Sequence, residues 1–108
     1  MLRDRLAAVE AVALLEREAT RRAPAIQEHL AMCHCAAARC HEGLGDIVAA
    51  REAAMSGLDA LEESLSGPRR LSRIVAKTAR HLLRITGPDR PEAHHRVHAS
   101  LGAFDQVQ

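Results

Sequence analysis

The fold of this chain is decided by a stretch of twenty residues, Ile26–Gly45, which reads IQEHLAMCHCAAARCHEGLG. The stretch contains all three cysteines and three of the seven histidines of the 108-residue chain. It ends at Gly45-Asp46, the clearest pair of helix-ending and helix-capping residues in the sequence. The stretch therefore has the residue types of a chemical site and the spacing of a packed helix.

Apolar residues recur in this stretch at steps of three and four, as they do on one face of a helix. This predicted core stripe consists of Ile26, Leu30, Cys33, Ala37, Cys40 and Leu44. Pro24 suits the first turn of the helix, and Gly43 and Gly45 should end it. Because the residue before a proline disfavours the helical region, we expect an earlier helix to end near Arg22.

Two helices are predicted on either side of this one. The first spans Leu2–Arg22, and its apolar row is Leu2, Leu6, Val9 and Ala13. The next begins after Asp46, which can cap it, and continues to the break at Ser66-Gly67-Pro68. Its predicted inner face is Ile47, Ala50, Ala54, Leu58, Leu61 and Leu65.

Two more helices are predicted in the remainder of the chain. One runs from about Arg69 to Thr86 and is strongly amphipathic. Its predicted inner side is Leu71, Ile74, Val75, Thr78, Leu82 and Ile85. The last follows Asp89-Arg90-Pro91-Glu92, which has the character of a capping box. Its predicted inward residues are Val97, Leu101 and Phe104.

The composition favours helices over strands, because Phe104 is the only aromatic residue and the apolar content is mostly aliphatic and alanine. Short connections between successive helices imply antiparallel neighbours. We therefore predict a single all-α domain over residues 1–108. It should contain four to five antiparallel helices, arranged as stacked helical hairpins or as a bundle.

The formal charge of +1 is unevenly distributed. Residues 1–65 carry seven Lys and Arg against eleven Asp and Glu, and residues 66–108 carry eight against three. Such asymmetry is typical of an intramolecular fit or of an acidic partner. No segment is apolar enough to span a membrane, and no signal-peptide core is visible. The odd number of cysteines indicates a reducing, cytoplasmic setting.

The Cys/His-rich stretch has two interpretations. On a helix, His29, Cys33 and Cys40 fall within about 40° of one another. With His94 and His98, which are four residues apart on the last helix, they could hold zinc or copper. The interpretation that we favour is that Cys33 and Cys40 are small core residues, since free cysteine is among the most buried residue types. It requires no cofactor.

Two short motifs in this stretch resemble metal or haem sequences. His29-Leu30-Ala31-Met32-Cys33 resembles the first half of the zinc-binding anti-sigma factor motif, although Cys33 and Cys35 are separated by one residue where that family has two. Cys35-Ala-Ala-Ala-Arg-Cys40-His41 is similar to a wide-spaced variant of the c-type haem attachment sequence. These resemblances imply a metal-binding regulator and an exported haem protein, respectively.

A row of basic residues follows the outer side of the helix predicted at 69–86. We expect it to contact a partner through Arg69, Arg73, Lys77, Arg80 and Arg84. Such a face could also neutralise nucleic-acid phosphates. The near absence of aromatic residues argues against stacking on single-stranded bases. A solvated face, or one that complements the acidic helix at 47–65, is the other interpretation.

Two segments resemble tetratricopeptide repeats. Leu44-Gly45-Asp46, Ala50 and Gly57-Leu58 follow the turn and second helix of that repeat, although His34 and His41 stand where large aromatic residues are expected. Gly87-Pro88-Asp89-Arg90-Pro91-Glu92 resembles the inter-repeat linker of the kinesin-light-chain type. The resemblance implies a concave helical surface that binds a protein segment.

No glycine-rich phosphate loop, nucleophile elbow or HExxH sequence is present, so we do not expect an enzyme. We predict a non-enzymatic module, such as an adaptor, chaperone or regulator, that binds another protein through a helical surface. A homodimer is a further expectation, because two chains can bury apolar surface that one cannot. The alternatives are a Cys/His metal-binding regulator and a basic helical bundle that associates with nucleic acid.

Overall fold

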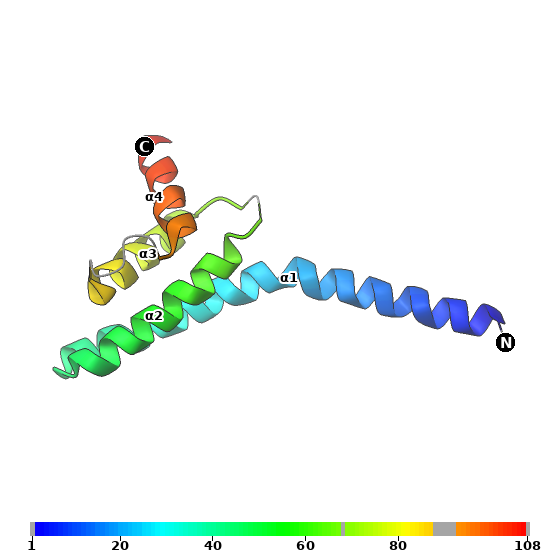
Figure 1. Ribbon diagram of the computed structural model, residues 1–108, viewed down its shortest axis with the longest axis horizontal. Coiled ribbons are helices and arrows are strands. Elements are labelled where there is room, and N and C mark those ends of the chain that lie inside the picture. The colour runs from blue at the N-terminus through cyan, green and yellow to red at the C-terminus, as the bar shows by residue number, and fades with distance from the viewer. Residues whose placement is uncertain (1, 68, 88–92, 108) are drawn as a thin grey trace.

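The structure is a computed structural model that describes residues 2–67, 69–87 and 93–107, and the side chains of these residues other than 2–6 and 15–23. Over these residues the chain forms four α-helices and no strand. They are α1 (Leu2–Gly43), α2 (Ile47–Ser64), α3 (Arg73–Thr86) and α4 (His95–Val107). The all-α prediction is confirmed (Figure 1).

The predicted break before Pro24 is wrong, because α1 is a single helix of 42 residues with Pro24 inside it. A proline in a helix removes one hydrogen bond and bends the axis, but it does not have to end the helix. The flanking alanines are strong helix formers and favour continuation. Figure 1 shows α1 changing direction about half-way along its length.

The turn between α1 and α2 agrees with the sequence prediction. Gly45 has a φ of +81°, a left-handed conformation that glycine adopts easily. The Asp46 carboxylate accepts a hydrogen bond from the Ala49 amide at 3.1 Å and caps α2. As a result, α2 runs back antiparallel along the second half of α1, whereas the first half extends away from the other helices (Figure 1).

The last two helices pack against this hairpin at different places. α3 contacts both α1 and α2, whereas α4 contacts α2 and α3 but not α1. α3 begins at Arg73 and not at Arg69, because the Ser72 hydroxyl accepts a hydrogen bond from the Val75 amide at 3.3 Å and sets the first turn. The predicted capping box at 89–92 lies outside the described residues.

The predicted core stripe of α1 is wrong, because it lies on the outer face of the helix. Ile26, Leu30 and Leu44 are 55%, 43% and 83% exposed, and Cys33, Ala37 and Cys40 are exposed as well. The buried face is formed by the small residues Ala31, Cys35 and Ala38.

Close packing by α2 explains why small residues are inside. A Cβ placed on Gly57 of α2 would lie 2.7 Å from Leu82 Cδ2 of α3 and 3.1 Å from His34 Cβ of α1. Three helices therefore meet at a position where a hydrogen atom is the only side chain. Helices can approach this closely only where the facing residues are small.

The other core predictions are mostly confirmed. In α2 the predicted face is buried except for Ile47, and in α4 Val97 and Leu101 are buried with Phe104 half-buried. In α3 the prediction for Ile74 is wrong, because this side chain is 60% exposed. Ala76 and Ala79 take its place in the core, and Thr78 is half-buried.

Candidate protein-binding surface

Three of the five basic residues predicted to bind a partner make ion pairs within the chain. Arg69 Nε lies 3.1 Å from Glu28 Oε1 of α1, and Arg80 of α3 pairs with Asp105 of α4. Arg84 donates two hydrogen bonds, of 2.9 and 3.1 Å, to the two carboxylate oxygens of Glu42 in α1. Basic residues before and within α3 therefore link it to α1 and α4.

The Arg84–Glu42 pair affects both groups. The hydrogen bonds from Arg84 lower the pKa of the Glu42 carboxyl, and the same bonds raise the pKa of Arg84. Arg73 and Lys77 are exposed and make no ion pair within the part of the chain that the structure describes. Of the predicted basic surface, these two cations are left for a partner.

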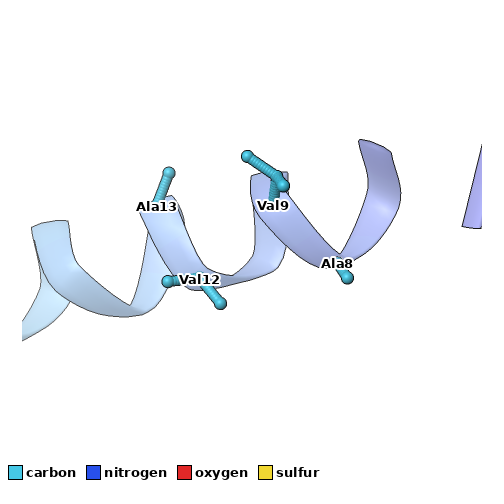
Figure 2. A pocket seen from close by; sticks show the side chains of 4 residues that line it. All are labelled: Ala8, Val9, Val12 and Ala13. Carbon is cyan, nitrogen blue, oxygen red and sulfur yellow. The ribbon is translucent and has the colours of Figure 1, made fainter. Parts of the chain in front are cut away.

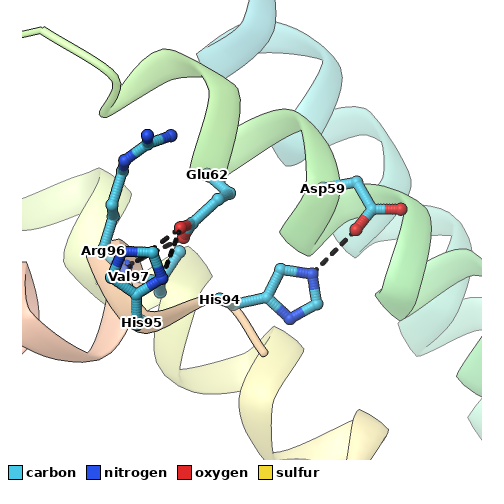
Figure 3. Close-up of polar contacts among 6 residues, drawn as sticks. All are labelled: Asp59, Glu62, His94, His95, Arg96 and Val97. Atoms are coloured by element: carbon cyan, nitrogen blue, oxygen red, sulfur yellow. Dashed lines mark hydrogen bonds and ion pairs between the residues drawn. The ribbon is translucent and has the colours of Figure 1, made fainter. Parts of the chain in front are cut away.

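Acidic residues of α2 also make contacts within the chain, to residues at the start of α4 (Figure 3). Asp59 Oδ1 lies 2.7 Å from His94 Nε2. The Glu62 carboxylate accepts hydrogen bonds from the backbone amides of Arg96 at 3.2 Å and Val97 at 3.1 Å. Glu62 thus caps the start of α4, where helix amides lack intrahelical acceptors. It shares the Val97 amide with the His94 carbonyl oxygen, which lies 3.0 Å from that nitrogen. Part of the charge asymmetry is therefore an intramolecular fit.

The five predicted metal ligands are not brought together. His29, Cys33 and Cys40 are exposed on α1, whereas His94 and His98 belong to α4, which has no contact with α1. Among the described residues, no group of three or more His, Cys, Asp or Glu side chains could hold a metal ion. The preferred interpretation of Cys33 and Cys40 as buried core residues is also wrong, because both are exposed.

Cys35 is the buried cysteine, although it is not among the predicted core residues. Its Sγ points to the backbone carbonyl of Thr78 in α3, at 4.0 Å. Burial raises the pKa of the Cys35 thiol. A buried, protonated thiol is a poor nucleophile. We therefore assign Cys35 a packing role between α1 and α3.

The exposed apolar row of α1 is the most extended surface feature of the described residues. We call it the α1 seam, and it consists of Ile26, Leu30, Cys33, Ala37, Cys40 and Leu44. Its steps of four and three residues are those by which two helices pack along a common line. The hairpin tip extends the seam, because Ile47 and Val48 are 52% and 69% exposed.

A hollow lies between the segment before α3 and the end of α4. Its apolar floor includes Leu71 and Phe104, and Arg69 and Arg70 line it as well. The guanidinium of Arg80 lies 5.9 Å from the centre of the Phe104 ring, where a cation is attracted to the ring face.

No family model, curated protein or solved structure matches the chain. The tetratricopeptide resemblance therefore stays a prediction. Ala50 and Gly57, two of the residues that carry it, are buried in α2. However, α1 alone is longer than the repeat unit of about 34 residues. The predicted linker falls largely within 88–92, outside the described residues. No helix of the described chain is long and apolar enough to cross a membrane.

Proposed function

We propose that this protein is a non-enzymatic interaction module that binds an amphipathic helix of another protein along the α1 seam. The observation that carries the proposal is the exposure of the seam itself. Six apolar or small residues at helix-packing spacing face outward, while the opposite face of the same helix is buried. This replaces the basic side of α3 as the preferred binding surface.

The dimensions of the α1 seam suit a helical partner. From Ile26 to Leu44 it extends about 27 Å at 1.5 Å per residue, the length of five helical turns. None of its residues is charged, so the matching face of the partner helix should be apolar. Arg73 and Lys77, exposed on α3, could favour an acidic rim on the partner.

Several features favour binding over chemistry. The buried thiol of Cys35 is held protonated, and neither exposed cysteine has a histidine base in hydrogen-bond contact within the described chain. Cys33 and Cys40 are exposed free thiols, which suits a reducing compartment such as the cytoplasm. The tetratricopeptide resemblance also favours protein binding. We propose an adaptor, chaperone or regulator that needs no cofactor.

The test uses a photo-crosslinking amino acid at Ala37, which is on the seam, and at Ala25, which is exposed on the same helix but off the seam. A protein partner should be crosslinked from position 37 and not from position 25. The partner, once purified, should bind the Leu30→Asp variant at least tenfold less tightly than the wild type, since a charge would be placed in an apolar contact.

An Ala25→Asp variant is the matched control and should bind the partner as the wild type does. If the Leu30→Asp variant also bound with unchanged affinity, the seam would not be the binding surface. Zinc uptake accompanied by a higher melting temperature would instead support the metal-binding alternative. Binding to DNA that weakens steeply with salt would support the nucleic-acid alternative.

A further inference from the structure

The first part of α1 has no packing partner among the described helices. We call residues 2–19 the α1 arm, and Figure 1 shows it extending away from the rest of the molecule. Most of its described aliphatic side chains are exposed, with Val9 at 66% and Val12 at 54%. Helices in proteins gain most of their stability from packing an apolar face, so a partner helix would stabilise the arm.

The middle of the arm carries a continuous apolar strip. Ala8, Val9, Val12 and Ala13 line a shallow apolar hollow on two successive turns (Figure 2). By the helical period they fall within an arc of about 140°, which is the width of a helix-packing face. The strip is therefore shaped to pack against another helix.

The sequence of the arm indicates which helix packs against the apolar strip. Continued at steps of three and four through Val9 and Val12, the row becomes Leu2, Arg5, Val9, Val12, Glu16 and Ala19. A single basic and a single acidic residue interrupt the row at equal distances from its centre. When two copies of the row lie side by side in opposite directions, Arg5 is opposite Glu16, Val9 is opposite Val12 and Leu2 is opposite Ala19.

We infer that the α1 arm pairs with the arm of a second copy of this chain, as a two-fold antiparallel coiled coil centred between Glu10 and Ala11. In this arrangement the arms overlap over residues 2–19. The overlap ends a few residues before Pro24, which lies inside α1.

The charges in the row select both the orientation and the partner. Arg5 and Glu16 are eleven residues apart, about 16 Å along one helix, so they cannot pair within a chain. In the antiparallel dimer each Arg5 position faces the Glu16 position of the other copy, so the dimer contains this pair twice. A parallel dimer would place Arg5 against Arg5 and Glu16 against Glu16, and so would bring like charges together.

The dimer does not rest on the proposed function, because it uses a different part of α1. The two arms would cross near their middles, and the two α1 seams would lie beyond opposite ends of the coiled coil. Each copy would then keep its seam for a partner. Two linked seams would increase the avidity for a partner that has two matching helices.

The test is the association of the untagged full chain, measured by sedimentation equilibrium with light scattering. The wild type should have twice the 11.7 kDa chain mass at micromolar concentration. Glu16→Arg should weaken association by about 100-fold or more, since each dimer gains two Arg–Arg contacts. The double variant Arg5→Glu with Glu16→Arg exchanges the charges and should restore association to within a few-fold.

Glu10→Arg is the matched control, because Glu10 lies outside the row and should leave association unchanged. Circular dichroism of every variant reports whether α1 stays folded, and rescue by the double variant separates pairing from unfolding. A monomeric wild type at about 100 μM, roughly 100-fold above a micromolar dissociation constant, would overturn the proposal. A double variant that stays as weak as Glu16→Arg would also overturn it.

Orientation is tested with the exposed native thiols removed by Cys33→Ser and Cys40→Ser. In this background, Val9→Cys chains mixed with Val12→Cys chains should form a disulfide between the two types of chain. Val9→Cys alone should crosslink poorly, because its two thiols would lie in different layers of the antiparallel pair. Efficient crosslinking of Val9→Cys to itself would indicate a parallel pair and overturn the proposal.

Discussion

Between Ile26 and Leu44, the two faces of α1 do not follow the simple rule that the more hydrophobic face of a helix is buried. The inner face consists of Ala31, Cys35 and Ala38, all small, whereas the outer face includes the larger Ile26 and Leu30. The difference shows that close approach of helices, and not the hydrophobicity of each residue, decides which face of α1 packs within the chain. The larger apolar residues, Ile26 and Leu30, are left on the exposed face.

Adjacent alanines on the two faces allow the sharpest test of this comparison. Ala38 is fully buried and Ala37 is exposed. We expect Ala38→Asp to cost more than about 3 kcal/mol, because it buries a charge with no partner. This is a large part of the free energy of unfolding of a small domain.

The matched variant Ala37→Asp should change the free energy of unfolding by no more than about 0.5 kcal/mol, as exposed substitutions usually do. Urea unfolding followed by circular dichroism measures both. Equal destabilisation by the two variants would mean that the faces are not distinct.

The close approach behind the inner face can be tested at Gly57. A Cβ there would lie 2.7 Å from Leu82 Cδ2, and Leu82 is fully buried and has little room to move. Gly57→Ala should therefore destabilise the protein by about 1–3 kcal/mol through overpacking. This should occur although alanine favours a helix by up to about 1 kcal/mol.

Gly102 in α4 provides the control, because nothing lies within 4 Å of the Cβ that an alanine would add. Gly102→Ala should stabilise the protein by up to about 1 kcal/mol, the propensity gain alone. Chemical denaturation gives both values. Stabilisation by Gly57→Ala would show that the three helices are less tightly packed than the structure indicates.

A smaller effect is expected where α2 holds the start of α4. Glu62→Ala removes a carboxylate that accepts from the amides of Arg96 and Val97, so it should cost about 1 kcal/mol, as the loss of a helix cap does. Hydrogen exchange should accelerate most at the Arg96 amide, because the Val97 amide still donates to the His94 carbonyl. Glu63→Ala, at an exposed residue without a described hydrogen bond, should leave both measurements unchanged.

Local features of the fold could be predicted from the sequence, and long-range ones could not. The Asp46 cap and the turn at Gly45 depend on a few neighbouring residues, and both are found where predicted. The path of α1 through Pro24 could not be predicted, because a proline bends a helix in some contexts and ends it in others. The cap that Glu62 provides for α4 joins residues 34 and 35 positions apart, so local patterns do not reveal it.

The face of α1 could not be chosen from its periodicity, because two apolar rows share the helix. Spacing gives the same helical period for both, and hydrophobicity favours the row with Ile26 and Leu30. Only the neighbours decide, through the close contact of α1, α2 and α3 around Gly57. The sequence therefore reveals the candidate surface as a row of residues but predicts the wrong side of the helix for it.

The reactivities of the three cysteines provide a direct test of both faces of α1. In the native protein a thiol-alkylating reagent should modify Cys33 and Cys40 readily, and Cys35 at least about 100-fold more slowly, since Cys35 reacts only after local opening. Mass spectrometry of digested samples measures the three rates. Similar rates at all three sites would mean that the inner face of α1 is open.

The raised pKa of Cys35 adds a dependence on pH. Because burial raises the pKa in the folded state, the unfolded chain loses this proton first as the pH rises. The contribution of Cys35 to stability should therefore be fully present below the ordinary thiol pKa of about 8.5 and decrease above it. The wild type should lose more stability than Cys35→Ala between about pH 7 and pH 10, a window that spans the ordinary thiol pKa. Equal losses in the two proteins would mean that the Cys35 thiolate is as well solvated in the folded chain as in the unfolded one, and would place this cysteine on the outer face with Cys33 and Cys40.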